Sequence, residues 1–162
     1  MPSRHRSRER ALQRLFQWEA SGQPAHDVMD AYWGGLSTEI GEPRPEEDAF
    51  ANSLLEGVSR RVSELDKLIR EHAENWRLER MSAVDRNILR LAIHEMRKLE
   101  TPPAIAIDEA IELGRRFSGE QSARFLNGIL DAVRRTLEKT GEIAAAPPSA
   151  DRPEPPAGGS KS

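Results

Sequence analysis

The chain has 162 residues, with 24 Lys+Arg, 27 Asp+Glu, no cysteine and a net charge of −3. This length suits one domain or two small subdomains that share a core. The lack of cysteine excludes disulfides, thiolate metal sites and cysteine nucleophiles. Charged residues make up 31% of the chain and aromatic residues only 5%, which favours helices over strands. No apolar run approaches the roughly 18 residues of a membrane span, and the arginine-rich start is not followed by the apolar segment of a secretory signal. We therefore expect an all-α protein of the cytoplasm with no membrane partner.

Apolar residues recur at helical spacing through the first half of the chain. The first helix carries Leu12 and Leu15 on its apolar stripe and ends at Gly22 and Pro24. A short second helix is expected over residues 25–36. Prolines and acidic residues at 43–48 predict the start of the next helix, because proline fits the first turn and acidic side chains suit a helix N-terminus. That helix is expected to break near position 63 and then to continue.

The second half begins with Ser82 three residues before Asp85, a pattern that resembles a capping box. The helix that follows is apolar around most of its circumference, so we expect it to be central. The break at 101–103 predicts a new helix that closes near position 117, and a last helix is expected to run to about position 139. The result is a compact bundle of about seven helices in two small packed subdomains. Gly128 lies within the last helix, which predicts that another helix approaches closely there.

Residues 141–162 contain five of the eleven prolines and almost no large apolar side chains. Such a segment cannot bury enough surface to offset the entropy lost on ordering. We therefore expect a folded domain over residues 1–140 and a disordered tail over 141–162.

Two segments are basic although the chain as a whole is slightly acidic. Residues 1–16 carry five arginines against one acid, and residues 115–135 carry five arginines against two acids. Residues 39–79 carry eleven acids against six basic residues. This asymmetry could let one face hold a polyanion while another meets a basic partner, although ordinary solvated helix faces would show the same pattern.

No catalytic constellation is present. None of the four histidines has metal-ligand spacing, and no phosphate-binding glycine loop or serine elbow occurs. His94 is best explained as a core or edge histidine. Acidic residues at 108–112 lie in the first turns of a helix, where they stabilise its dipole. We therefore expect neither an enzyme nor a cofactor, but a binding protein.

The corner at 117–125 has the features of a single-stranded nucleic-acid site. It combines two phenylalanines with Arg124, and arginine binds phosphates while aromatic rings stack on bases. Ser118 is expected to cap the last helix, whose free amides could meet a phosphate. Phe117 is better explained by core packing, whereas Phe125 and Phe16 could lie in the core or on the surface.

Three runs carry a family resemblance: 6–22, 82–96 and 102–133. The third, with IDEAIEL followed by FLNGILD, is the most specific. Together they resemble the bacterial NusB family of transcription antitermination factors over nearly all of residues 4–138. The resemblance implies an all-helical fold of two packed subdomains. It also implies binding to the single-stranded boxA element of ribosomal RNA leaders, together with NusE, a small-subunit ribosomal protein, in the RNA polymerase antitermination complex.

The resemblance also implies site residues. It places RNA contacts at Arg4, Arg6, Arg8, Phe16, Gln121 and Phe125, and the chemistry of the corner at 117–125 adds Ser118 and Arg124 to the expected RNA-binding residues. The surface that faces NusE is expected to include Glu79 and Asp85. The family often has tyrosine at position 16 and an acid at position 121, so this chain lacks that hydroxyl group and that negative charge.

Two other functions fit parts of the pattern. A helical protein-interaction scaffold would bind protein without retaining RNA. A NusB-like domain also occurs in a family of ribosomal RNA methyltransferases, but this chain contains no methyl-donor domain, so that function would require the chain to be a fragment.

Overall fold

The computed structural model describes residues 3–28, 48–73 and 78–144, and most of these residues are helical. Residues 25–28 are also helical, and the rest of the helix expected over 25–36 lies outside the described residues. No strand occurs in the described ranges, and none of their helices is long and apolar enough to cross a membrane. The elements are α1 (Arg4–Ser21), α3 (Ala49–Arg60), α4 (Val62–His72), the 3-10 helix η1 (Leu78–Arg80), α5 (Ala83–Lys98), α6 (Pro103–Phe117) and α7 (Glu120–Lys139).

Local signals start and stop these helices. The Ser82 hydroxyl caps α5 by accepting a hydrogen bond from the Asp85 amide at 3.1 Å, and Asp48 caps α3 by accepting from the Ala51 amide at 3.0 Å. Gly22 ends α1 with a left-handed φ of 71°, which glycine adopts without steric cost. The break expected near position 63 lies at Arg61, between α3 and α4.

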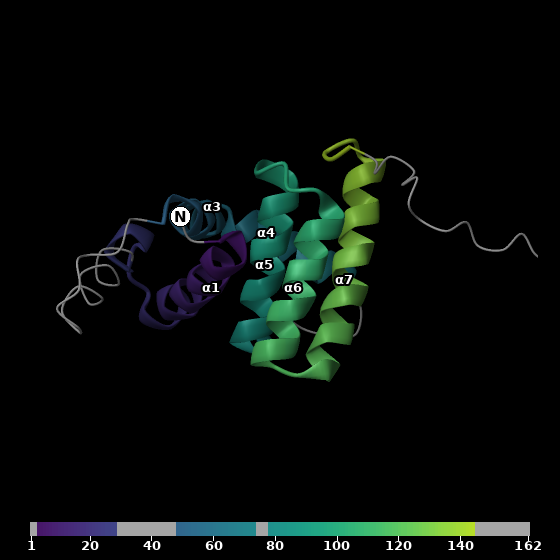
Figure 1. Ribbon diagram of the computed structural model, residues 1–162. Helices are drawn as coiled ribbons and strands as arrows, with labels where there is room; N and C mark the ends of the chain where they lie inside the picture. The colour runs from purple at the N-terminus through teal and green to yellow at the C-terminus, as the bar shows by residue number, and fades with distance from the viewer. Residues whose placement is uncertain (1–2, 29–47, 74–77, 145–162) are drawn as a thin grey trace, which may run out of the picture.

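Helix α5 is central, as its apolar circumference predicts. It packs against α1, α3, α4, α6 and α7, and most of its residues from Asn87 to Met96 are almost fully buried. Helices α5, α6 and α7 stand side by side, while α1 crosses beside α5 (Figure 1). One continuous apolar core joins residues of every α-helix in the described ranges. This shared core fixes the position of α7 relative to α5.

The close helix approach expected at Gly128 is wrong. Gly128 is exposed, and a Cβ atom there would meet nothing within 4 Å. The close approaches lie instead at Gly57, against the His94 ring, and at Gly114, against Leu126. A Cβ atom at Gly114 would lie 2.3 Å from Leu126 Cδ1.

Opposite effects of alanine are therefore expected at two helical glycines. Gly128→Ala should raise the free energy of unfolding by about 0.5–1 kcal/mol, because alanine restricts the unfolded chain and meets no neighbour. Gly114→Ala should lower it by about 1–3 kcal/mol through overpacking against Leu126. Urea denaturation of both variants measures the two effects. Destabilisation by Gly128→Ala would contradict the exposed position of this residue.

The folded domain extends past the boundary expected at residue 140. Ile143 is only 9% exposed and joins the core, and its amide donates to the Leu137 carbonyl at 3.3 Å. Glu142 forms an ion pair with Arg97 at 3.0 Å. The turn at 141–143 therefore belongs to the domain. The rest of the expected tail, from residue 145, lies outside the described residues.

Candidate nucleic-acid interface

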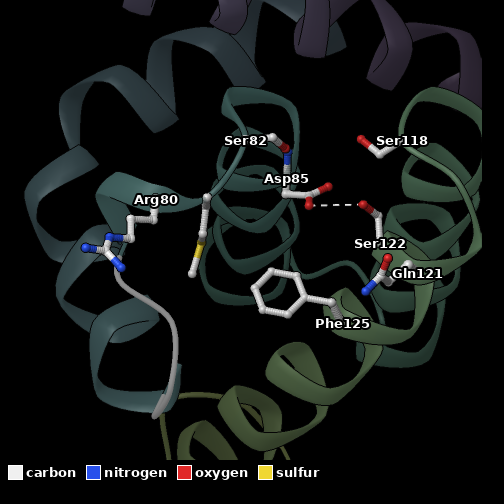
Figure 2. Close-up of a pocket in the computed structure, with 8 residues that line it drawn as sticks. Arg80, Ser82, Asp85, Ser118, Gln121, Ser122 and Phe125 are labelled. Atoms are coloured by element: carbon white, nitrogen blue, oxygen red, sulfur yellow. Dashed lines mark hydrogen bonds between the residues drawn. The ribbon is translucent and has the colours of Figure 1, made fainter.

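A hollow of about 300 Å³ lies between the start of α5 and the start of α7. We call it the α5–α7 groove, and its lining residues are Arg80, Met81, Ser82, Asp85, Ser118, Gln121, Ser122 and Phe125. Figure 2 shows the Phe125 ring pointing from α7 into the groove below Asp85, with Arg80 on the far side of the groove. The groove therefore combines an aromatic ring, a carboxylate, a guanidinium group and three hydroxyl groups, from the starts of α5 and α7, the turn before α5 and the end of α6.

Three residues predicted to bind RNA line this groove: Ser118, Gln121 and Phe125. Asp85, predicted to face a protein partner, lines it too and is only 9% exposed. Its Oδ2 atom accepts a hydrogen bond from the Ser122 hydroxyl at 3.1 Å (Figure 2). Asp85 therefore lies inside the groove, and its contact with a protein partner stays a prediction. The other expected partner residue, Glu79, is 68% exposed and forms an ion pair with Arg70 at 3.3 Å.

Ser118 does not cap α7. It is the residue that ends α6, and the cap of α7 is Gly119, with a φ of 105° and no side-chain hydrogen bond. A positive φ favours glycine, which explains why the chain turns at position 119. Ser118 therefore contributes an exposed hydroxyl group to the groove rather than a cap.

Arg8 is the clearest departure from the predicted site. Its side chain is 5% exposed, and its guanidinium group donates to both carboxylate oxygens of Glu95, at 2.7 and 2.8 Å. Thr101 donates a further hydrogen bond to Glu95 at 3.1 Å. Burial lowers the pKa of Arg8, but the hydrogen bonds and charge of Glu95 outweigh burial and raise it. Arg8 is thus committed to the core, and its predicted phosphate contact is wrong.

The arginines of the two basic segments differ in what they contact. Arg10 pairs with Asp48, and Arg116 with Glu9. Arg115, Arg134 and Arg135 also pair with acids on their own or neighbouring helices. Among the described residues, exposed arginines for which no ion pair is found include Arg6, Arg80 and Arg124. Of these, Arg80 was not predicted as a site residue, because nothing local in the sequence brings the turn before α5 beside α7.

Two aromatic side chains outside the groove are exposed. Phe16 on α1 is 49% exposed, and Phe117 at the end of α6 is 41% exposed, with the Arg116 guanidinium carbon 5.5 Å from its ring centroid. The expected core position of Phe117 is therefore wrong. Exposed rings near cationic side chains can stack on unpaired bases. Arg4 is held differently, because its guanidinium carbon lies 4.4 Å from the Phe50 ring centroid.

A second polar cluster fixes the turn that carries Arg80. The Arg86 guanidinium group donates to the Leu78 and Met81 carbonyls at 3.2 and 3.1 Å, and it also pairs with Glu19 near the end of α1. Arg90 pairs with the same Glu19 carboxylate and with Asp66 of α4. Burial raises the pKa of Glu19, but its hydrogen bonds with Arg86 and Arg90 outweigh burial and lower it. These contacts hold one wall of the groove against α1.

Comparison with known proteins gives one consistent result. The model of the NusB family matches residues 5–135. The transcription antitermination protein NusB of Solibacter usitatus is 49% identical over 149 residues, which cover 92% of this chain and 97% of that protein. The NusB protein of Myxococcus xanthus is 41% identical over 140 residues, covering 86% and 99%.

Solved structures agree with the fold. A crystal form of T. maritima NusB matches with a TM-score of 0.70 and 32% identity over 83% of this chain and 92% of that chain. A structure of NusB and NusE in complex with double-stranded RNA contains a chain that matches with a TM-score of 0.68. That match covers 83% of this chain and 99% of the other at 23% identity, which shows a shared fold.

Proposed function

Since this chain belongs to the NusB family, we propose that it is an RNA-binding transcription antitermination factor rather than an enzyme. Its RNA is a boxA-type single strand of ribosomal RNA leaders, and its protein partner is NusE. The pair acts in the cytoplasm with RNA polymerase and needs no cofactor. The observation that carries this proposal is the similarity, over almost the whole chain, to proteins named transcription antitermination protein NusB.

The geometry supports RNA binding at the α5–α7 groove and along α1. Arg80 lines the groove, and Arg124 is the neighbour of Phe125 in the chain; both arginines are exposed. Single-stranded RNA is typically bound by cationic side chains that meet phosphates and by rings that stack on bases. Arg6 and Phe16 offer the same two features on α1, about 15 Å apart at 1.5 Å per residue.

The proposed RNA-binding residues are therefore Arg4, Arg6, Phe16, Arg80, Ser118, Gln121, Arg124 and Phe125. Glu79 is the proposed NusE contact, because it is exposed and acidic beside a partner that carries basic charge. The alternative function is a helical scaffold that binds only protein, and such a scaffold would not bind RNA.

A salt titration separates the two kinds of RNA contact. Arg6→Ala should weaken binding to a boxA-type RNA and flatten the log–log salt dependence by about 0.7, because one phosphate contact is lost. Phe125→Leu keeps an apolar side chain against the core but removes the ring, so it should weaken binding by about 1–3 kcal/mol with an unchanged salt slope. Fluorescence anisotropy with and without NusE measures both quantities.

Arg135→Ala is the matched control for Arg6→Ala, since Arg135 is exposed but paired with Asp131 far from the groove, on the last turns of α7. It should leave affinity and slope close to those of the parent protein. Failure of the parent protein to bind boxA-type RNA, even with NusE, would contradict the proposed function and support the scaffold.

A further inference from the structure

Asp85 holds an unused hydrogen-bond acceptor in the α5–α7 groove. Its Oδ2 atom is taken by Ser122, but its Oδ1 atom is buried and has no hydrogen-bond partner among the described residues. Figure 2 shows this second oxygen on the side that faces Ser118, across from the ring of Phe125. A buried carboxylate oxygen without a donor costs free energy, so the site favours a ligand that brings an N–H or O–H group.

The negative charge decides which part of an RNA strand can meet this oxygen. A phosphate would be repelled by the carboxylate, whereas a base edge can donate to it. Arg80, at the other side of the groove in Figure 2, suits the phosphate instead. The hollow of about 300 Å³ is at the small end of ligand pockets, roughly 300–1,000 Å³, which suits one base beside Phe125.

The four bases differ in what their Watson–Crick edges would offer to Asp85. Adenine and cytosine each place a ring-nitrogen acceptor beside their amino group, and uracil places a carbonyl on each side of its N–H group. Guanine alone has two adjacent donors, N1–H and the N2 amino group. A carboxylate has about four acceptor positions, so Asp85 can keep its bond from Ser122 and still accept both.

We infer that the α5–α7 groove is a guanine-reading site in which Asp85 accepts from the Watson–Crick edge of one unpaired guanine and Phe125 packs against its ring. The inference rests on the proposed function, because it assumes that the groove meets RNA. It assigns Asp85 to base discrimination rather than to the surface that faces NusE. Ser122 orients the carboxylate through its hydrogen bond, and Ser118 lines the same groove.

Inosine tests the inference in the unmodified protein, because it is guanosine without the N2 amino group. Each guanosine of a boxA-type RNA is replaced in turn by inosine, and binding is measured by anisotropy with the full chain. One replacement should weaken binding about 10- to 100-fold, the loss expected for a hydrogen bond to a charged acceptor. The other replacements should change binding less than about 3-fold.

Asp85→Asn is the matched variant, since it keeps the size of the side chain and removes the charge. It should bind guanosine RNA more weakly and should no longer distinguish the sensitive guanosine from inosine. Ser122→Ala should keep the distinction, because the acceptor remains. Melting curves show whether each variant is folded, and the inosine scan of the parent protein stands if Asp85→Asn does not fold.

Three results would overturn the inference. The first is a parent protein that binds the RNA but shows no inosine-sensitive position. The second is a folded Asp85→Asn variant that keeps the full distinction. The third is an Asp85→Asn variant with unchanged RNA binding and weakened NusE binding. That result would mean that the Oδ1 atom of Asp85 accepts from a basic side chain of the protein partner. A parent protein that binds no RNA at all would instead contradict the proposed function.

Discussion

Glu95→Ala is expected to lower the free energy of unfolding by about 3–5 kcal/mol. The substitution removes the carboxylate that accepts both hydrogen bonds of the Arg8 guanidinium group, which is 5% exposed, and leaves the Glu109 carboxylate, 3.8 Å away, as the ion-pair partner found among the described residues. Removing the hydrogen-bonded partner of a buried charge is one of the most destabilising changes in a protein interior. It also removes the acceptor of the Thr101 hydroxyl group. Urea denaturation at constant ionic strength measures the change.

Two control variants identify the cause. Arg8→Met combined with Glu95→Leu removes both charges, so it should be much less destabilised than Glu95→Ala alone. Arg6→Ala lies two residues away on the exposed side of α1 and should change stability by less than about 0.5 kcal/mol. If the double variant is as unstable as Glu95→Ala, lost packing rather than an unpaired charge explains the effect.

Acid should destabilise the protein through His94. This side chain is 4% exposed in the core, and burial, followed by the nearby positive charges of Arg61, Arg97 and Lys98, lowers its pKa to about 4. Between pH 6.5 and 4 the unfolded chain takes up a proton that the folded chain does not. The free energy of unfolding should therefore fall, as pH decreases through this window, by a His94 contribution on the order of 3 kcal/mol that is fully present above pH 6.5.

His94→Leu isolates this contribution. Its stability should depend less on pH than that of the parent protein between pH 6.5 and 4, whatever its stability at neutral pH. Carboxylates and His5 titrate in both proteins, so their contributions cancel in the difference. Parallel stability curves for the two proteins across this window would show that folding does not lower the pKa of His94.

Local signals explain why the helices could be predicted and why several side chains could not. The cap at Ser82, the stop at Gly22 and the proline start of α6 act within a few residues, and each was recognisable in the sequence. The exposure of Gly128 depends instead on which helix lies opposite α7, and no local pattern contains that information.

The position of Arg8 could have been found in part. It lies three, four and seven residues before Ala11, Leu12 and Leu15, which are all buried, so it shares their stripe on α1. Its partner Glu95 is 87 residues away and lies on a helix that is apolar on most sides. The groove likewise depends on distant parts of the chain, because Arg80 and Phe125 line one groove only after α5 and α7 have packed. A count of arginines therefore predicted a basic segment but not which of its charges remain available.

The attachment of α1 at two points limits the lengths that this helix can have. Arg8 is bound to Glu95 and Glu19 to Arg86, so α1 runs antiparallel to α5 between two ion pairs. The pairs are 11 residues apart on α1 and 9 on α5, about 16 and 14 Å of helix. Inserting or deleting one residue between Arg8 and Glu19 would rotate one end by about 100° and separate one pair. Changes in length should therefore be excluded from this segment in evolution, while substitutions on its outer face remain permitted.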